Sequence, residues 1–563
     1  MSGTASGLDT ALWRGRYPDG IAGEIDLDAL PSLVELFAES VERFAARPAY
    51  TSLGVTLTYA DLERESRAFA AYLQGALGVR KGERVALVMP NVLAYPVALF
   101  GALRAGATVV NTNPLYTARE MGDQLSDSGA VAVVVLESMA ATLQAALADV
   151  RLRGVMVARV GDLMGAKGRL VNLVVRRVKR MVPPYRIPGA LTLAAALADG
   201  RRRALEPVEV GPDDLAFLQY SGGTTGRAKG VMLTHRNLAA NVEQCRAWFA
   251  PALRLGEETM VTALPLYHVF ALTVNCLLML RCGARNLLIL NARDLPGFVK
   301  TLRGERFTAI TGVNTLFAHL LGTPGFADLD FSGLRLTVAG GMAAQRPVAE
   351  RWKAVTGRPM IEGYGLTEAS PVTNCNRLDI DEFTGAIGYP LPSTEVAIRG
   401  PDGAELGVGE PGELCFRGPQ VMRGYWNRPD ETAAVLGADG FLASGDVGYI
   451  GEDGMIRVVD RLKDTIVVSG FNVYPNEVEE IAAGCAGVRE CAVVGVPEGA
   501  TGESVAIYVV RDDPALTEAA LLEHLRANLA RYKVPHRVAF RDDLPKTPVG
   551  KVLRRALREE VGP

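Results

Sequence analysis

The first part of the chain alternates short apolar runs with segments whose apolar residues recur at helical spacing. The runs at 84–89, 107–110, 130–136 and 154–160 are typical of buried strands, and residues 61–77 have the pattern of an amphipathic helix. Strands that alternate with helices are joined by right-handed crossovers into a largely parallel sheet covered on both faces. The pattern therefore predicts an α/β fold.

The end of the chain follows a different pattern. A helix is expected from Asn476, strands at 491–496 and 505–510, and a further helix at 517–530. About a hundred residues are enough for a domain. We therefore expect a large multi-layer N-terminal domain with mostly parallel sheets and a small α+β C-terminal domain.

Composition and charge narrow the class of protein. The chain of 563 residues is too long for one ordinary domain, and its 48% of hydrophobic residues can fill a packed core, which excludes global disorder. A net charge of −3 argues against extensive nucleic-acid binding. The seven cysteines lack any C-x-x-C spacing, which is typical of reduced thiols rather than of a disulfide framework or a zinc site. Residues 1–17 lack the apolar core of a signal peptide, and no apolar run reaches the roughly 20 residues of a spanning helix, so we expect a cytoplasmic protein.

One stretch, 167–186, carries seven basic residues and no acidic one. On a helix, one side would hold Val171, Val174, Val175, Val178 and Met181, and the other Asn172, Arg176, Lys179 and Arg180. A basic amphipathic helix can lie on an anionic membrane, where each cation contributes on the order of 1 kcal/mol. The alternative is a solvated face that packs on the protein through its valines. Peripheral contact with the inner face of a membrane is therefore an open prediction.

The stretch 221–230 concentrates the residue types that bind polyphosphates. It contains four glycines, three hydroxyl side chains and two cations. Glycines let backbone N–H groups approach anionic oxygens, hydroxyls donate further hydrogen bonds, and a lysine such as Lys229 supplies a point charge. The Walker A spacing is absent, because Lys229 lies between Ala228 and Gly230. The alternative is a flexible surface turn.

Three further stretches are candidates for the walls of a site. Residues 264–270 place an aromatic cluster around His268, and 307–321 is a second apolar stretch, so both can line an apolar pocket or belong to an ordinary core. His268 is better suited to a gate or packing role than to that of a base. The strand at 334–338 runs into glycines, and ligands of open α/β sheets bind beyond the carboxyl ends of strands.

A later G-Y-G-L-T-E motif and two turns carry side chains suited to a nucleotide. A planar base can stack on Tyr364, Thr367 can reach a phosphate, and Glu368 can hold Mg²⁺, which prefers carboxylate and phosphate oxygens. Asp446, between glycines, can accept hydrogen bonds from sugar hydroxyls. Lys551 follows a turn rich in Pro and Gly. Each feature alone is also typical of an ordinary turn or of a solvated lysine.

Together the motifs form an ordered set: S-G-G-T-T-G-R-A-K-G, G-Y-G-L-T-E, S-G-D, D-R-L-K-D-T-I-V-V-S-G-F-N-V-Y-P-N-E-V-E and P-K-T-P-V-G-K. This set resembles the adenylate-forming superfamily of acyl-CoA synthetases, adenylation domains and luciferases. Within it, A-F-L-Q-Y-S-G-G-T-T-G and T-A-L-P-L-Y-H-V-F-A-L-T are most similar to bacterial long-chain fatty-acid–CoA ligases. The similarity runs from about Arg16 to the C-terminus.

The resemblance implies a domain organisation. Residues 1–459 would form the N-terminal AMP-binding domain and 464–563 a mobile C-terminal domain that carries the catalytic lysine. The hinge would lie at 460–463, with Lys463 at the family's hinge position. The start of the glycine-rich loop has one Gly more than the commoner S-G-T-T-G form, a difference shared with the fatty-acid branch.

The resemblance also implies roles for individual residues. Lys551, Thr367 and Glu368 would be catalytic, with Glu368 as the metal ligand and Lys551 as a bridge between the substrate carboxylate and the α-phosphate. The acyl pocket and its gate would involve His268, Gly312 and Val313, and the CoA region Ser469, Gly470 and Phe471. The residues implied to bind ATP or AMP are Ser221, Gly222, Gly223, Thr224, Thr225, Gly226, Lys229, Gly341, Met342, Gly363, Tyr364, Gly365, Leu366, Thr367, Asp446 and Arg461.

The implied activity is the ATP-dependent conversion of a long-chain fatty acid to acyl-AMP, with release of pyrophosphate, followed by transfer to coenzyme A. ATP, Mg²⁺ and coenzyme A are therefore expected as co-substrates and cofactor. The alternatives are a medium-chain or aryl acid–CoA ligase, a fatty acyl-AMP ligase, and a non-catalytic membrane-associated lipid-binding protein. A homodimer is left open, and no nucleic-acid partner is expected.

Overall fold

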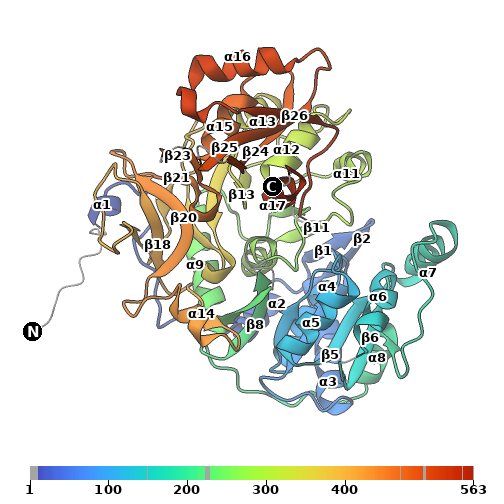
Figure 1. Cartoon of the computed structure of the whole chain (residues 1–563). Helices are drawn as coiled ribbons and strands as arrows, with labels where there is room; N and C mark the ends of the chain where they lie inside the picture. Colours follow the sequence, from blue (N-terminus) through green and yellow to red (C-terminus); the bar gives the residue numbers. More distant parts are fainter. Residues whose placement is uncertain are drawn as a thin grey trace, which may run out of the picture.

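The computed structural model describes residues 11–148, 150–221, 228–468, 471–498, 502–547 and 550–561. These residues form four sheets (Figure 1). Two large, mostly parallel sheets and one small antiparallel sheet take up the chain as far as Arg461, and the fourth sheet lies in the C-terminal part. The predicted α/β class, with a small α+β part at the end, is confirmed.

The first large sheet has the strand order β19-β9-β8-β4-β3-β5-β6-β7. Its strands from β3 to β8 run parallel to their neighbours, and β9 and β19 are added antiparallel. The strands are β3 (Arg84–Val88), β4 (Thr108–Asn111), β5 (Ala130–Leu136), β6 (Gly154–Ala158), β7 (Leu191–Thr192), β8 (Leu215–Ser221), β9 (Lys229–Thr234) and β19 (Gly424–Tyr425). The four strands predicted from apolar runs are β3 to β6.

Helices cover this sheet because each must bury an apolar stripe. The helix predicted at 61–77 is α3 (Tyr59–Gly75), which begins with a capping box between Thr58 and Asp61. It packs closely on α4 (Ala94–Arg104), since a Cβ on Gly101 would lie 2.8 Å from Cδ1 of Phe69. The other helices of this part are α2 (Leu33–Arg43), α5 (Ala118–Ser128), α6 (Ala140–Ala146) and α8 (Leu193–Gly200).

The second large sheet has the order β16-β15-β14-β13-β12-β10-β11-β1-β2, and its six strands from β14 to β1 run parallel. The strands are β1 (Pro48–Ser52), β2 (Val55–Thr58), β10 (Thr259–Thr262), β11 (Arg285–Leu288), β12 (Ala309–Gly312), β13 (Leu336–Gly340), β14 (Ile361–Gly365), β15 (Val372–Cys375) and β16 (Tyr389–Pro390). The helices are α9 (His235–Phe249), a π-helix (Ala271–Leu278), α10 (Met279–Arg281), α11 (Leu295–Leu302), α12 (Asn314–Leu321) and α13 (Arg346–Thr356).

The third sheet is antiparallel and leads towards the C-terminal part. Its strands are β17 (Glu395–Arg399), β18 (Gly412–Arg417), β20 (Leu442–Ile450) and β21 (Ile456–Arg461), and α14 (Pro429–Ala433) precedes β20. After β21, a 3₁₀ turn (Leu462–Asp464) carries the chain into the fourth sheet.

The C-terminal part has hydrophobic clusters of its own, separate from the large core that spans Trp13 to Ile456. Its strands are β22 (Ile466–Val468), β23 (Phe471–Val473), β24 (Val488–Glu498), β25 (Gly502–Arg511) and β26 (Arg537–Arg541). Its helices are α15 (Pro475–Ala483), α16 (Glu518–Asn528) and α17 (Arg554–Val561). Separate cores are expected of a unit that can move as a body.

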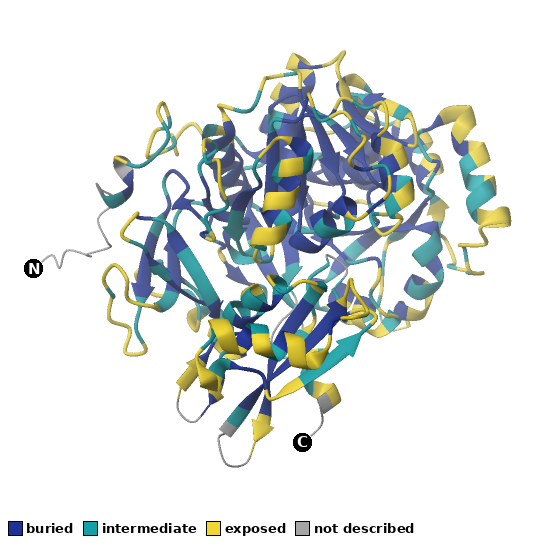
Figure 2. Ribbon diagram, turned by 90° about the horizontal axis from the view of Figure 1, so that it is seen from above, coloured by how far each residue is buried: buried dark blue, intermediate teal, exposed yellow. Residues whose placement is uncertain are grey.

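The basic stretch forms α7 (Gly165–Leu173), which continues into a π-helix (Val174–Val178) at the edge of the molecule (Figure 1). Figure 2 shows this helical segment standing out from the body with many exposed residues. The predicted division into faces holds in part. Val171, Val174 and Val175 are half-buried and Lys179 and Arg180 are exposed, as predicted. However, Val178 and Met181 are exposed, Asn172 accepts a hydrogen bond from the N–H of Gly161, and Arg176 pairs with the buried Glu137. Within the described ranges, no helix is long and apolar enough to cross a membrane.

Candidate active site

A cavity of about 1960 Å³ opens at the carboxyl ends of β13 and β14. One wall consists of residues 338–345 and 362–368, which are the ends of these strands and the loops after them. The opposite wall comes from β20, from β21 and its turn, and from the segment around Lys551. The cavity therefore lies where parallel sheets place ligands, and it is shared between the large N-terminal part and the C-terminal part.

Most predicted site residues meet at this cavity. Those that line it are Ser221, Lys229, His268, Gly341, Met342, Gly363, Tyr364, Gly365, Leu366, Thr367, Glu368, Asp446, Arg461, Lys463 and Lys551. Those outside the described residues are Gly222, Gly223, Thr224, Thr225, Gly226, Ser469 and Gly470.

Three predicted residues are not among those that line the cavity. Phe471 is 59% exposed, and its ring lies 5.1 Å from the ring of Tyr532 on the surface of the C-terminal part. Gly312 ends β12 in close contact with the ring of Phe317. Val313 is buried beside Gly341 at the edge of the cavity. Their roles in the CoA region and the acyl pocket stay predictions.

Lys551 reaches the cavity from a turn that is docked on the N-terminal part. Its N–H donates to Oγ1 of Thr547 (3.1 Å), and the hydroxyl of Thr315 on α12 donates to the carbonyl of Gly550 (3.2 Å). Burial, aided by the Arg461 guanidinium and opposed by the carboxylates of Asp446 and Glu368, lowers the pKa of Lys551 to about 8. The lysine is therefore a mostly charged group at neutral pH that can lose its proton within the ordinary range.

Gly341 gives the lysine its room. Its φ of +80° is in the left-handed region, and a Cβ there would lie 3.4 Å from Cε of Lys551. The glycine after β13 therefore permits the turn and also lets the Lys551 side chain come close to the backbone. A side chain at this position would crowd Lys551.

Asp446 is a buried carboxylate on the cavity wall that lies opposite the ends of β13 and β14. It lies on β20, directly across the antiparallel pair from Arg461 on β21, whose Nε is 3.1 Å from Oδ1 of Asp446. The hydroxyl of Tyr364 donates to the other oxygen, Oδ2. The three residues named from separate motifs are thus held together by direct polar contacts.

Glu368 follows β14 in a 3₁₀ turn (Thr367–Ala369). Its Oε1 accepts hydrogen bonds from the hydroxyl of Tyr425 (2.9 Å) and from the hydroxyl of Ser221 (3.4 Å). No three His, Cys, Asp or Glu side chains gather into a metal cluster in the part of the chain that the structure describes. One carboxylate beside hydroxyls fits Mg²⁺, which typically binds one or two carboxylates together with substrate phosphates and water.

Lys229 begins β9 and already has an acidic partner. Its ammonium pairs with the carboxylate of Glu431 on α14 and lies 4.9 Å from the ring centroid of Tyr425. Burial and the Glu368 carboxylate raise the pKa of Tyr425, so its hydroxyl stays protonated and donates. Tyr425 thus contacts the predicted phosphate lysine with its ring and the predicted metal ligand with its hydroxyl.

Three residues of this site were missed by the sequence reasoning: Tyr425, Glu431 and Glu362. Oε1 of Glu362 accepts from the N–H of Ala344 (3.2 Å), and its Oε2 has no hydrogen-bond partner among the described residues, although the side chain lines the cavity. Burial raises the pKa of Glu362 to about 8, so the group is mostly protonated at neutral pH. Its place directly before G-Y-G-L-T-E is the local signal that could have pointed to it.

His268 lines the cavity near Lys551. Burial lowers the pKa of His268 to about 3, and the positive charge of Lys551 acts in the same direction. The imidazole is therefore neutral at physiological pH. A neutral ring against an apolar wall suits the gate or packing role that the sequence suggested.

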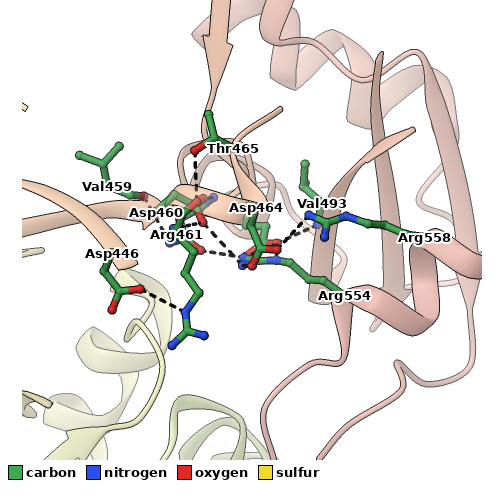
Figure 3. A network of polar contacts seen from close by, with 11 residues as sticks. Asp446, Val459, Asp460, Arg461, Asp464, Thr465, Val493, Arg554 and Arg558 are labelled. Atoms are coloured by element: carbon green, nitrogen blue, oxygen red, sulfur yellow. Dashed lines mark hydrogen bonds and ion pairs between the residues drawn. The ribbon is translucent and has the colours of Figure 1, made fainter. Parts of the chain in front are cut away.

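A polar network surrounds the connection between the two parts (Figure 3). Arg554, three residues after Lys551, pairs with Glu479 on α15 (2.8 Å) and lies 3.7 Å from Asp460 and 3.6 Å from Asp464. Arg558 of α17 pairs with Asp464 (2.9 Å). Asp460 is the first residue of the predicted hinge and the other residues follow the hinge, so the network joins β21 to the C-terminal part in this conformation.

The chain was compared with known families, proteins and structures. The AMP-binding enzyme family matches residues 37–426, and the AMP-binding enzyme C-terminal domain matches residues 477–551. A long-chain-fatty-acid–CoA ligase of Yersinia pestis is 55% identical, and one of Escherichia coli O157:H7 is 54% identical, each over 98% of both chains. The crystal structure of a benzoate CoA ligase from Burkholderia xenovorans LB400 superposes with a TM-score of 0.81 at 28% identity, covering 94% of this chain and all of that one.

Proposed function

The chain belongs to the family of AMP-binding enzymes, and on this premise we propose that it activates a long-chain fatty acid with ATP and transfers the acyl group to coenzyme A. The first step gives acyl-AMP and pyrophosphate, and the second gives acyl-CoA and AMP. The observation that carries the proposal is the buried ammonium of Lys551, which shares one cavity with Glu368, Tyr364 and Asp446.

The first step needs positive charge at the reacting centre. A fatty carboxylate is a poor acyl donor, so it must attack the α-phosphate of ATP, although both reactants are anionic. The Lys551 ammonium can lie between the two and stabilise the charge that develops as pyrophosphate leaves. Bound Mg²⁺ would neutralise further phosphate charge. Glu368 would hold the metal, and the hydroxyl of Thr367 would contact phosphate.

The nucleotide would lie between the strand ends and the third sheet. The ring of Tyr364 and the backbone of Gly341 and Met342 offer flat surfaces for the adenine, and Asp446 with Arg461 would hold the ribose hydroxyls. The free Oε2 of Glu362 is a further hydrogen-bonding group for the base. Lys229 and the loop at 222–226, which lies outside the described residues, would hold the departing phosphates.

The second step needs room that Lys551 occupies. The thiol of coenzyme A must reach the acyl carbon that Lys551 approached in the first step. We infer a mobile domain at 464–563, a hinge at 460–463 with Lys463 at the family's hinge position, and an N-terminal domain at 1–459, because rotation at the hinge would withdraw Lys551. Separate hydrophobic clusters on either side of the hinge support this division.

The substrate class can be tested directly. AMP release that depends on CoA, measured over acids from short to very long chains with mass spectrometry of the thioesters, is expected to be fastest with long-chain acids. Preference for benzoate-like or medium-chain acids would favour the aryl or medium-chain alternative. Accumulation of acyl-AMP without thioester would favour the fatty acyl-AMP ligase. Absence of ATP–pyrophosphate exchange would leave the lipid-binding alternative.

We also propose peripheral contact of the 167–186 segment with anionic membranes. Leu170, Leu173, Val178 and Met181 are 55–70% exposed on a protruding helical segment, which also carries the exposed cations Arg177, Lys179 and Arg180. An exposed apolar strip beside cations is suited to the boundary between headgroups and acyl chains. A homodimer stays a prediction without support from the fold.

The membrane proposal is tested by cosedimentation with anionic vesicles. The variant Leu170→Ser with Leu173→Ser, and separately the neutralisation of Arg177, Lys179 and Arg180, should each lower binding several-fold. Leu115→Ser is the matched control, since Leu115 is 56% exposed elsewhere on the protein. Unchanged sedimentation of both test variants would refute the contact.

A further inference from the structure

The lysine at the phosphate side of the cavity is held by an internal anion. Lys229 pairs with Glu431, and the side chains are 19% and 38% exposed, so both stay in contact with water. Glu431 lies on α14, a short helix about two hundred residues further along the chain. The pair therefore joins the strand after the glycine-rich loop to a segment that no motif had marked.

The position of Glu431 is fixed by the fold. The N–H of Trp426 donates to the carbonyl of Gly230 (2.7 Å), and Tyr425 pairs with Val231 between β19 and β9. Arg428 pairs with Asp127 (3.0 Å), which also accepts from the hydroxyl of Tyr220 at the end of β8. The segment that carries Glu431 is thus attached to both strands that flank the glycine-rich loop.

The same segment engages the predicted metal ligand. Tyr425 donates to Glu368 and lies beneath the ammonium of Lys229, so both groups expected to meet the phosphates are held by residues 425–431. A polyphosphate that enters this side of the cavity competes with Glu431 for the ammonium of Lys229.

We propose that Glu431 is an affinity-setting residue, an internal counter-ion that polyphosphate must displace from Lys229. It weakens the hold on ATP phosphates, and after the first step it takes the lysine back and speeds the departure of pyrophosphate. The identity of the ligand rests on the proposed function. The residue acts through Lys229 and not on the reacting atoms.

Pyrophosphate itself is the probe, in calorimetric titrations of the full-length protein without fatty acid or CoA. Glu431→Gln is expected to bind pyrophosphate about three- to fivefold more tightly than the unchanged protein, as removal of a partly exposed ion pair allows. Asp430→Asn is the matched control. Asp430 directly precedes Glu431 and is exposed on the same helix, and the affinity of this variant for pyrophosphate should not change.

A second background separates the pair from other effects. Arg428 also lies 3.6 Å from Glu431, so in Glu431→Gln the freed Arg428 guanidinium could itself attract the anion. In a Lys229→Met background, Glu431→Gln is expected to give no gain in pyrophosphate affinity. A gain that persists there, or equal or weaker binding by Glu431→Gln alone, would overturn the proposal. If the protein binds pyrophosphate in this pattern but forms no acyl-AMP, the proposed function fails and the counter-ion role stands.

Discussion

Two lysines of one cavity are prepared in opposite ways. Lys551 comes from the C-terminal part and has no ion-pair partner in the described ranges, and burial lowers its pKa to about 8. Lys229 comes from the N-terminal part and is paired with Glu431. One cation is desolvated and unpaired, and the other is neutralised in advance.

The difference matches the two ends of a triphosphate. A cation at the reacting centre stabilises developing charge best when no other anion competes for it. A cation at the leaving group must bind and then release pyrophosphate, so a counter-ion that it can return to is useful. The following changes break or sharpen this comparison.

Lys551→Ala should have the largest effect. Loss of the ammonium at the reacting centre is expected to lower ATP–pyrophosphate exchange about 10²–10³-fold, the usual consequence of removing one key donor. Arg555→Ala is the control, because Arg555 lies nearby on α17 with an exposed side chain that pairs with Glu559. Exchange at the normal rate in Lys551→Ala would refute the role.

Arg554→Ala should loosen the segment that carries Lys551. It leaves the buried carboxyls of Asp460 and Glu479 without their cation, and breaking one partner of a buried pair costs about 3–5 kcal/mol. Thermal unfolding followed by circular dichroism and limited proteolysis of the C-terminal part should both reveal the loss. Melting and proteolysis like those of Arg555→Ala would contradict the inference.

The pH dependence of adenylation should report the protonation of Lys551 in the free enzyme. With a lowered pKa, Lys551 is charged below about pH 8 and neutral above it. The kcat/KM for ATP in pyrophosphate exchange should therefore fall up to tenfold per pH unit above about 8, since this quantity reports groups of the free enzyme. A value that stays flat to pH 10 would show that the charge on Lys551 is not needed.

Lys229→Ala should have a smaller and one-sided effect. Because Lys229 is expected to touch only the leaving phosphates, adenylation should weaken about tenfold, whereas thioester formation from supplied acyl-AMP should change little. Stopped assays of the two half-reactions give the comparison. Equal losses in both would count against the assignment to the leaving group.

Local patterns predicted much of the fold. Apolar runs found β3 to β6, and an apolar stripe at helical spacing found α3, because strand and helix periods leave a direct trace in the sequence. Lys551, Tyr364 and Asp446 were found from motifs in which glycine or proline marks a turn that presents one side chain. The structure brings these three to one cavity.

Contacts between distant segments left no such trace. No local pattern near Glu431 points to a partner about two hundred residues earlier, and none near Tyr425 points to one fifty-seven residues earlier. The pairing of β19 with β9 and the contacts beside it bring these residues together. The faces of the helical segment within 167–186 were predicted only in part, for another reason. A regular helical wheel ignores the π-helix at Val174–Val178, and the buried Glu137 draws Arg176 to the body of the protein.

The most direct test of the account is the ratio of the two half-reactions in Lys551→Ala. Pyrophosphate exchange and thioester formation from synthetic acyl-AMP would be measured on the same preparation. The account predicts that exchange is lost at least a hundredfold while thioester formation stays within about threefold of the unchanged protein. Equal losses in both half-reactions, or normal exchange, would contradict the claim that Lys551 serves the adenylation step alone.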